Sequence, residues 1–594
     1  MFNSNHSKGT LGKRGIMLDY IKKISWYIVS NKKRYILIVI FLMLANLLDI
    51  IPPQLIGRTI DLINNGELTA AMTRNILLIF IGVIISTYVV SYWWGYLLFE
   101  GAIKIESILR SRLMRKFLLL SPGFYERSKT GDLMAKATND LKTVNMATGF
   151  GIITLLDATT FLLTIILVMG ITISWPLTIF ALLPLPLLAV VESRLGKMIN
   201  TRHKASQEAF GVMNDAVLEV VEGVRLTRSY VQESAENKRF HKLTDNYLKK
   251  FMKVEQLDAF FQPLTIIVVS LSIAISFGYG AVLVNNGVIT VGELITFNVY
   301  LNMLIWPMFA LGMLFNIMER GNASYDRIQG VLDESDDLND SGDQEINGTL
   351  FNFDDVTFKY PSGEYNSLEN ITLELNKGET LGIVGKTGSG KSTFIKQLLK
   401  IYPEGTGNLI IDGLNISTLD RKKLRDKLGY VSQENILFSK TVRENILFGK
   451  PDASPRELDE AIRLSAFDED LKRMPDGLDT LVGEKGVSLS GGQKQRISIA
   501  RSLIKSPDIL ILDDALSAVD ARTEQRIINH IKENRTGKTT IIITHRLSAV
   551  HHADKIIVLD KGEIVEEGTH DMLSKGRGWY GEQNDYFLTG GDSE

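Results

Sequence analysis

Hydrophobic residues are distributed unevenly along this chain. Long apolar runs occur only before about Met318, and the remainder alternates short apolar segments with charged and glycine-rich ones. A helix needs about 20 residues to cross the hydrocarbon core of a bilayer. The runs predict six membrane-spanning helices, near residues 35–55, 76–98, 152–174, 177–191, 263–284 and 295–318. The first half of the chain, residues 35–332, is therefore predicted to be a helical membrane domain.

Charged residues beside the apolar runs predict the orientation of this domain. Lys and Arg are frequent before the first run and after the second, whereas connections 174–176 and 285–293 contain neither. Lys and Arg are enriched in cytoplasmic connections, so both termini are predicted to lie in the cytoplasm. Residues 1–34 are predicted to form a cytoplasmic segment, in which the basic and aromatic stretch 20–28 forms an interfacial elbow helix.

Two of the predicted cytoplasmic connections, 99–151 and 192–262, are too long for ordinary loops. Both keep helical spacing with few Gly or Pro residues, so the helices are expected to continue beyond the membrane. Each is interrupted once, around 121–125 and around 222–225. These turns are predicted to contact a cytoplasmic domain, and solvated helical hairpins are the alternative.

The character of the sequence changes after residue 332. The acidic and polar stretch 333–349 predicts an exposed linker, and a mixed α/β pattern then continues over 350–594. The net charge of −2 gives no reason to expect nucleic acid as a partner. The sequence contains no cysteine, which excludes disulfides, thiolate metal sites and cysteine nucleophiles.

The chemistry of the second half centres on a glycine-rich loop. An apolar run at 380–384 predicts a buried strand, and 394–399 predicts a helix. Between them lies a G-x-x-x-x-G-K-S motif in the order that a phosphate-binding loop requires. Backbone N–H groups and the helix N-terminus would bind phosphates, the lysine would reach the β- and γ-phosphates, and the serine would bind Mg²⁺. The predicted nucleotide-binding residues are Gly385, Lys386, Thr387, Gly388, Ser389, Gly390, Lys391, Ser392 and Thr393.

Two further segments carry the chemistry of a P-loop ATPase. The apolar strand 509–513 ends in Asp513, a carboxylate placed to organise Mg²⁺. The segment 489–496 begins a helix whose free N–H groups form another anion site. A single chain thus contains two predicted phosphate-binding helix starts.

Residues 489–493, Leu-Ser-Gly-Gly-Gln, resemble the signature of ATP-binding-cassette (ABC) proteins. The resemblance implies that Tyr360 stacks on adenine, that Gln433 is the Q-loop glutamine, that 517–520 is the D-loop and that His545 is the switch histidine. It implies Ser392, Gln433 and Asp513 as the Mg²⁺ site. Residues 483–486 resemble the loop with which exporters touch the opposite membrane domain, although Leu481 replaces a common glutamate. Signature residues Ser490, Gly491, Gly492 and Gln493 would bind the ATP of a second cassette.

One position departs from the family pattern. The residue after the second acid is usually Glu, which polarises the attacking water, and here it is Asp514. Its side chain is shorter by about 1.5 Å, and a misplacement near 1 Å can reduce a rate by about 10²-fold. Asp514, a catalytic residue by resemblance together with His545 and Gln433, is therefore expected to support little hydrolysis.

The resemblance implies a six-span α-helical membrane domain followed by an α/β P-loop domain, as in an ABC half-transporter. With Asp514, it is similar to the shorter, degenerate subunit of heterodimeric multidrug exporters of Gram-positive bacteria, the BmrC/BmrD and LmrC/LmrD type. The expected function is export of amphipathic drugs or lipid-like compounds across the bacterial plasma membrane, driven by ATP and Mg²⁺. The partner would be a second half-transporter that carries the glutamate. The alternatives are a homodimeric lipid or peptide exporter and a membrane sensor without cargo.

Overall fold

The computed structural model describes residues 13–335, 350–361, 363–483 and 489–588. Its contacts divide the chain into two units. Unit 1 comprises the residues up to 118 together with 131–334, and unit 2 comprises residues 119–130 together with 335–594. Most of the predicted linker 333–349, and most of the predicted loop 483–486, lie outside the described residues.

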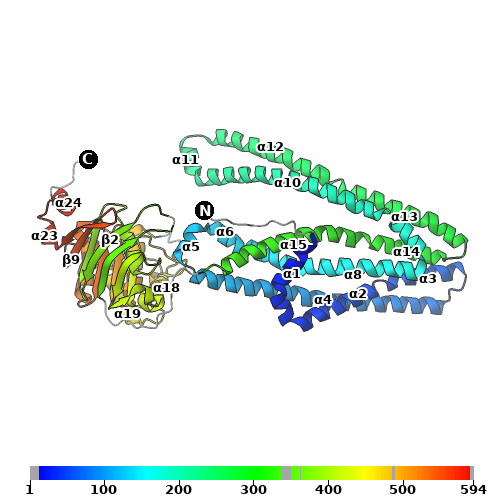
Figure 1. Ribbon diagram of the computed structural model, residues 1–594, viewed down its shortest axis with the longest axis horizontal. Coiled ribbons are helices and arrows are strands. Elements are labelled where there is room, and N and C mark those ends of the chain that lie inside the picture. The colour runs from blue at the N-terminus through cyan, green and yellow to red at the C-terminus, as the bar shows by residue number, and fades with distance from the viewer. Residues whose placement is uncertain (1–12, 336–349, 362, 484–488, 589–594) are drawn as a thin grey trace. The chain divides into compact units, whose positions relative to one another are not determined.

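Unit 1 consists of helices (Figure 1), several of them much longer than a bilayer is thick. The longest are α4 and α10. The segments that connect α6, α7, α8 and α9 are short π-helices. The helices are α1 (Lys13–Ser30), α2 (Lys32–Leu48), α3 (Ile51–Asn64), α4 (Ala70–Leu119), α6 (Thr130–Ala135), α7 (Leu141–Met146), α8 (Ile152–Val168), α9 (Trp175–Leu182), α10 (Leu185–Glu222), α11 (Val224–Ser229), α12 (Glu233–Asp258), α13 (Phe261–Asn285), α14 (Val291–Met303) and α15 (Ile305–Leu332).

Among the described residues, four helical stretches are long and apolar enough to cross a membrane: 32–64, 70–119, 130–182 and 233–285. The predicted spans at 177–191 and 295–318 are each divided between two helices, with breaks at 183–184 and at Leu304. The count of six spans therefore stays a prediction. Large apolar side chains on α4, such as Leu77, Leu78 and Ile85, are exposed, as expected for a surface that faces lipid.

Both predicted interruptions of the long connections coincide with helix breaks. Helix α4 ends at Leu119 before the short helix α5 (Pro122–Arg127), and α10 ends at Glu222, where Gly223 separates it from α11. Helix α12 then packs along α10, so residues 185–258 form a helical hairpin (Figure 1). The predicted helical continuation of both connections is confirmed.

Polar contacts fix the helix pairs of unit 1 where the backbones come close. The Asp61 carboxylate accepts hydrogen bonds from the Gly292 N–H (2.7 Å) and the Thr290 hydroxyl (2.6 Å), which joins α3 to the start of α14. In the elbow helix α1, the Tyr20 hydroxyl donates to the carbonyl of Val144 at 2.9 Å. The Lys23 ammonium lies 2.6 Å from the Asp326 carboxylate of α15. The predicted helix at 20–28 thus exists and packs on other helices of unit 1.

Unit 2 is built on two sheets. The antiparallel sheet has the order β2-β1-β4-β5, and the larger sheet has the order β10-β9-β3-β8-β7-β6, in which β9, β3, β8, β7 and β6 are parallel. The strands are β1 (Phe351–Phe358), β2 (Leu368–Leu375), β3 (Thr380–Gly385), β4 (Thr406–Ile411), β5 (Leu414–Asn415), β6 (Leu428–Val431), β7 (Ile509–Asp513), β8 (Thr539–Ile543), β9 (Lys555–Asp560) and β10 (Glu563–Gly568).

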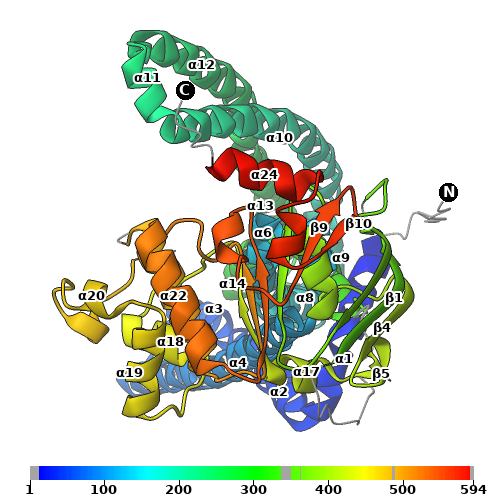
Figure 2. The ribbon, with the colours of Figure 1, turned by 90° about the vertical axis from the view of Figure 1, so that its left-hand side faces the viewer.

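Helices cover the parallel strands of unit 2, and α18, α19 and α20 lie together on the side away from β1 and β4 (Figure 2). The α-helices of unit 2 after residue 350 are α16 (Lys391–Leu398), α17 (Arg421–Lys427), α18 (Val442–Leu447), α19 (Pro455–Leu464), α20 (Asp468–Leu471), α21 (Gly491–Leu503), α22 (Ala521–Asn534), α23 (His570–Leu573) and α24 (Trp579–Leu588).

The parallel strands are continuous apolar runs because both of their faces are buried. Strands β7 and β8 are buried at every position. Since parallel strands end at the same edge of a sheet, the segments after β3, β6, β7, β8 and β9 meet there. Those segments contain the phosphate loop, Gln433, Asp514, His545 and Lys561.

Candidate nucleotide-binding site

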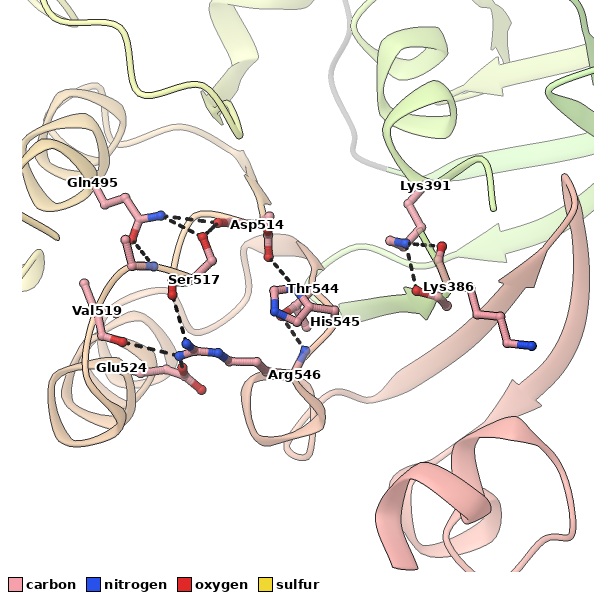
Figure 3. A network of polar contacts seen from close by, with 12 residues as sticks. Lys386, Lys391, Gln495, Asp514, Ser517, Val519, Glu524, Thr544, His545 and Arg546 are labelled. Atoms are coloured by element: carbon pink, nitrogen blue, oxygen red, sulfur yellow. Dashed lines mark hydrogen bonds and ion pairs between the residues drawn. The ribbon is translucent and has the colours of Figure 1, made fainter. Parts of the chain in front are cut away.

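The phosphate loop connects β3 to α16, and a side chain at Gly385 or at Gly390 would collide with neighbouring backbone. Gly385 has φ +145°, and a Cβ there would lie 2.1 Å from the carbonyl oxygen of Leu559. Gly390, with φ +106°, is the N-cap of α16. The Lys391 ammonium donates to the carbonyls of Gly385 and Lys386, each at 2.8 Å (Figure 3). Burial lowers the pKa of Lys391, and the nearby carboxylates of Asp513 and Asp514 oppose this.

A cleft of about 900 Å³ lies at this edge of the sheet. It is lined by most of the phosphate loop and by the residues that follow four other parallel strands. The predicted site residues in its lining are Thr387, Gly388, Ser389, Gly390, Lys391, Ser392, Thr393, Gln433, Asp513, Asp514 and His545. The fold thus brings together residues that are separated by up to 158 positions, 545 − 387, in the sequence.

Ser392, Gln433 and Asp513 present a hydroxyl, an amide and a carboxylate to the cleft. These hard oxygen donors suit Mg²⁺. Asp513 ends β7, is 4% exposed and accepts a hydrogen bond from the Tyr430 hydroxyl at 3.3 Å. Burial and the charge of Asp514 raise its pKa. A divalent cation would relieve the repulsion between these two carboxylates, so the residues fit the predicted metal.

Asp514 adopts a left-handed backbone conformation with φ +47°. Its N–H donates to the carbonyl of Ile543 at 2.9 Å, and its own carbonyl accepts from the Ser517 hydroxyl at 3.0 Å. Its carboxylate lies 3.0 Å from Nδ1 of His545 (Figure 3). Asp tolerates this conformation better than most residues, and the surrounding hydrogen bonds hold it in place.

The D-loop after Asp514 is held from two sides. Gln495 of α21 is 2% exposed; its amide accepts from the Ala518 N–H at 2.9 Å and donates to the Ser517 hydroxyl at 3.0 Å. On the other side, the Arg546 guanidinium donates to the carbonyl of Ser517 at 2.9 Å and to the buried Glu524 carboxylate at 2.8 Å (Figure 3). The residue after the switch histidine thus helps to fix the D-loop.

The signature residues lie outside the cleft lining. Ser490 is the N-cap of α21 and forms a capping box with Gln493. A Cβ at Gly492 would lie 3.0 Å from the carbonyl oxygen of Ala518, so the helix start packs closely on the D-loop. Within the described part of the chain, the cleft is lined by none of Ser490, Gly491, Gly492 and Gln493.

Tyr360 also lies outside the cleft lining, but next to the phosphate loop. Its hydroxyl lies 3.1 Å from Oγ1 of Thr393, and its ring packs edge-on against Phe358 and Tyr402. Gly385 and Lys386 likewise do not line the cleft, and their carbonyls accept the hydrogen bonds of the Lys391 ammonium.

Comparison with known families decides the identity of this arrangement. The family described as the ABC transporter transmembrane region matches residues 35–308, and the family described as ABC transporter matches residues 368–517. The chain belongs to the ABC transporter family. Its predicted fold class, a helical membrane domain followed by an α/β nucleotide-binding domain, is confirmed.

Several relatives match this ABC transporter over nearly its whole length. It is 49% identical to the probable multidrug resistance ABC transporter ATP-binding/permease protein YheI of Bacillus subtilis, covering 96% of this chain and 97% of that protein. It is 38% identical to the multidrug resistance-like ATP-binding protein MdlA of Escherichia coli, covering 94% and 95%. The solved structure of a bacterial Atm1-family ABC exporter with ATP bound is 25% identical, with a TM-score of 0.79 over 95% of this chain and 99% of that chain.

Some residues of the cleft were not predicted from the sequence. Lys561 and Gly562 line it from the turn between β9 and β10, where both have positive φ, and residues 364–367 line it from the segment before β2. Asp560-Lys561-Gly562 is recognisable as a hairpin turn. Nothing local indicated that the strand before it would lie parallel to β3, which is what places the turn at the site.

Proposed function

We propose that this ABC transporter is one half of an ATP-driven exporter of small hydrophobic or amphipathic compounds in a bacterial plasma membrane, with both termini in the cytoplasm. Three features support the proposal. The cleft gathers the residues of an ATPase, apolar helices precede it, and relatives that match over nearly the whole chain are named as multidrug resistance proteins.

The placement of Asp514 supports a second part of the proposal, that this chain's own site hydrolyses ATP slowly. Its backbone is fixed by hydrogen bonds of its N–H and carbonyl, so the backbone has little freedom to move forward and compensate for a side chain shorter by about 1.5 Å than glutamate. The carboxylate is directed to His545. The site formed by this chain's own phosphate loop would therefore hold ATP and hydrolyse it slowly.

The signature serves a different nucleotide in this proposal. Ser490, Gly491, Gly492 and Gln493 begin a helix of 13 residues whose N-terminus lies outside the chain's own cleft. A helix N-terminus favours anions, so these residues would complete the site of a second cassette. A partner of different sequence, with Glu in the position of Asp514, would then provide most of the hydrolysis.

Five residues of the cleft, Lys391, Ser392, Gln433, Asp513 and His545, have assigned roles in this mechanism. Lys391 binds the phosphates, while Ser392, Gln433 and Asp513 hold Mg²⁺, which neutralises phosphate charge when bound. His545 contacts the γ-phosphate. Closure of two cassettes on ATP biases the membrane helices between two arrangements, and hydrolysis in the partner's site reverses the bias. The turns 121–125 and 222–225 are the proposed links between closure and the helices.

Purification from native membranes tests the assembly. A tag on this chain is expected to recover an equimolar second half-transporter that carries the glutamate. The complex in liposomes should move an amphipathic cationic dye uphill when ATP and Mg²⁺ are added, and the dye should stimulate ATP hydrolysis. Recovery of this chain alone as a pair would favour a homodimeric exporter. ATP-dependent recruitment of a signalling protein without dye movement would favour a sensor.

A further inference from the structure

Three aromatic rings and one cation form a compact cluster behind the phosphate loop. The rings of Tyr360 and Tyr402 pack edge-on, with centroids 5.1 Å apart and an interplanar angle of 89°. Phe358 packs against both. The Lys396 ammonium, on the helix that begins with Lys391, lies 5.3 Å from the Tyr360 ring centroid and 5.8 Å from that of Tyr402. A displacement of one ring would therefore displace the rings packed against it.

A hydrogen bond joins the cluster to the short helix α5. Tyr402 is 3% exposed, yet its hydroxyl donates to the Glu126 carboxylate of α5. Burial and the charge of Glu126 raise the pKa of Tyr402, so the phenol remains a donor at neutral pH. Residues 119–130 belong to unit 2 by their contacts. By chain connectivity the same residues join α4, which contains a predicted span, to α6.

We propose that Tyr402 links the base-binding ring of Tyr360 to Glu126, so that α5 responds to the base of a bound nucleotide. The inference rests on the proposed role of Tyr360 in stacking on adenine. A base stacked on Tyr360 would fix the angle of that ring, and edge-to-face packing would pass the constraint to Tyr402. The charge-assisted hydrogen bond to Glu126 would then hold α5 in one position.

A purely structural role for Tyr402 makes a different prediction. If the Tyr402 hydroxyl merely anchored α5, the anchor would be equally strong with any ligand in the phosphate loop. A link through the rings depends on the base, because triphosphate alone would occupy the loop, which Tyr360 meets only through its hydroxyl at Thr393, and would not stack on the Tyr360 ring. The comparison of ATP with inorganic triphosphate therefore separates the two roles.

The test uses the full-length protein in lipid nanodiscs, in the assembly in which it is purified, and measures hydrogen–deuterium exchange of the backbone amides of 119–130. A non-hydrolysable ATP analogue with Mg²⁺ is expected to slow this exchange by about tenfold or more, the effect of a modest stabilisation of the segment. Inorganic triphosphate is expected to have less than half of that effect on a logarithmic scale. Equal protection by both ligands would overturn the proposal.

Substitutions then locate the link. Tyr402→Phe keeps the ring and removes the hydroxyl, so it should bind the ATP analogue within about threefold of the native affinity and lose most of the base-dependent protection of 119–130. Glu126→Ala should lose as much, and the double variant no more than either. Glu126→Gln retains an acceptor oxygen and should keep part of the effect. Native protection in Tyr402→Phe would overturn the link.

Tyr580→Phe is the matched control. Tyr580 is fully buried in unit 2, and its hydroxyl forms a hydrogen bond with His570 at 2.8 Å, so this variant loses a comparable buried interaction elsewhere. It should keep the native response of 119–130, and an equal loss there would contradict the link. Tyr360→Ala tests the role on which the inference rests. This variant should weaken binding of the ATP analogue and leave binding of triphosphate unchanged. An unchanged affinity for the ATP analogue would refute the base-binding role of Tyr360, and the inference with it.

Discussion

At the scale of single residues, the chemistry proposed for this ABC transporter depends on two adjacent carboxylates with different surroundings. Asp513 is buried at the end of β7, whereas Asp514 turns into a left-handed conformation and faces His545. A position of this kind costs about 1–3 kcal/mol and persists only where its surroundings impose it. The neighbouring hydrogen bonds do so here, and one step along the chain thus separates the proposed metal ligand Asp513 from the proposed catalytic group Asp514.

Asp513 should make the stability of the chain depend on pH when Mg²⁺ is absent. Burial and Asp514 raise its pKa above the ordinary value of 3.8, so the folded chain binds more protons than the unfolded chain as pH rises from that value. The free energy of unfolding should therefore fall over this range. In Asp513→Asn this component should be missing. The measurement is the thermal midpoint of the full chain against pH; identical profiles for both proteins would contradict the assignment.

Lys391→Met should strongly weaken nucleotide binding. The ammonium would lose its place against the phosphates, and loss of a charge-assisted contact in a partly buried site should weaken ATP by about 10²-fold or more. Lys377→Met is the control, because Lys377 has an exposed side chain between β2 and β3 and does not line the cleft. Fluorescent ATP binding measures both. Native affinity in Lys391→Met, or an equal loss in the control, would contradict the role given to Lys391.

At the scale of elements, the start of α21 has two functions. Its capping box satisfies the free N–H groups of the helix and shapes the signature, while Gln495 on the next turn holds the D-loop beside Asp514. The two proposed halves of this chain's nucleotide chemistry, its own cleft and its contribution to a partner, are thus joined through one helix. A disturbance of that helix should affect both.

Gln495→Leu should reveal this connection. The buried Ala518 N–H and Ser517 hydroxyl would lose a partner, which costs about 1–3 kcal/mol, and the D-loop would be released. We expect the thermal midpoint to fall and ATP turnover at saturating ATP to fall with it, with little change in ATP affinity. Gln493→Leu alters the same helix but breaks the capping box instead, so it should reduce turnover in the partner's site. A Gln495→Leu variant with native turnover would refute the coupling.

Elements with strong local patterns were predictable from the sequence. Strand β7 has the predicted bounds 509–513, and β3 contains the predicted strand 380–384, because buried parallel strands are uniformly apolar. The breaks at 183–184 and at Leu304 were not foreseen, since apolar composition continues across them while the backbone turns. Hydropathy measures the solvent a segment prefers and does not by itself determine where a helix ends.

The nucleotide-binding site was likewise predictable only in part from the sequence. The phosphate loop and Asp513 carry their chemistry in short motifs, and the cleft gathers them as expected. The contacts of Gln495, Arg546 and Lys561 depend on strand order and on side-chain packing. A pattern along the chain does not contain that information.

At the scale of the whole molecule, the chain combines a helical membrane domain with a cassette that has a complete phosphate loop, a complete signature and an aspartate, Asp514, as the proposed catalytic acid. In the account proposed here these parts imply an unequal pair, in which this subunit holds its own ATP and completes the reactive site of another. An equal pair of slow sites is the competing arrangement, and symmetric assemblies are common.

ATP turnover by the purified chain alone, in nanodiscs with Mg²⁺ and with Asp514→Asn measured beside it, tests the unequal division most directly. An unequal pair predicts ATP turnover about 10²-fold below the roughly 10 s⁻¹ typical of enzymes. Asp514→Asn should leave this turnover nearly unchanged. Addition of the glutamate-bearing partner should increase the turnover greatly. Turnover of several per second by the chain alone, abolished by Asp514→Asn, would contradict it.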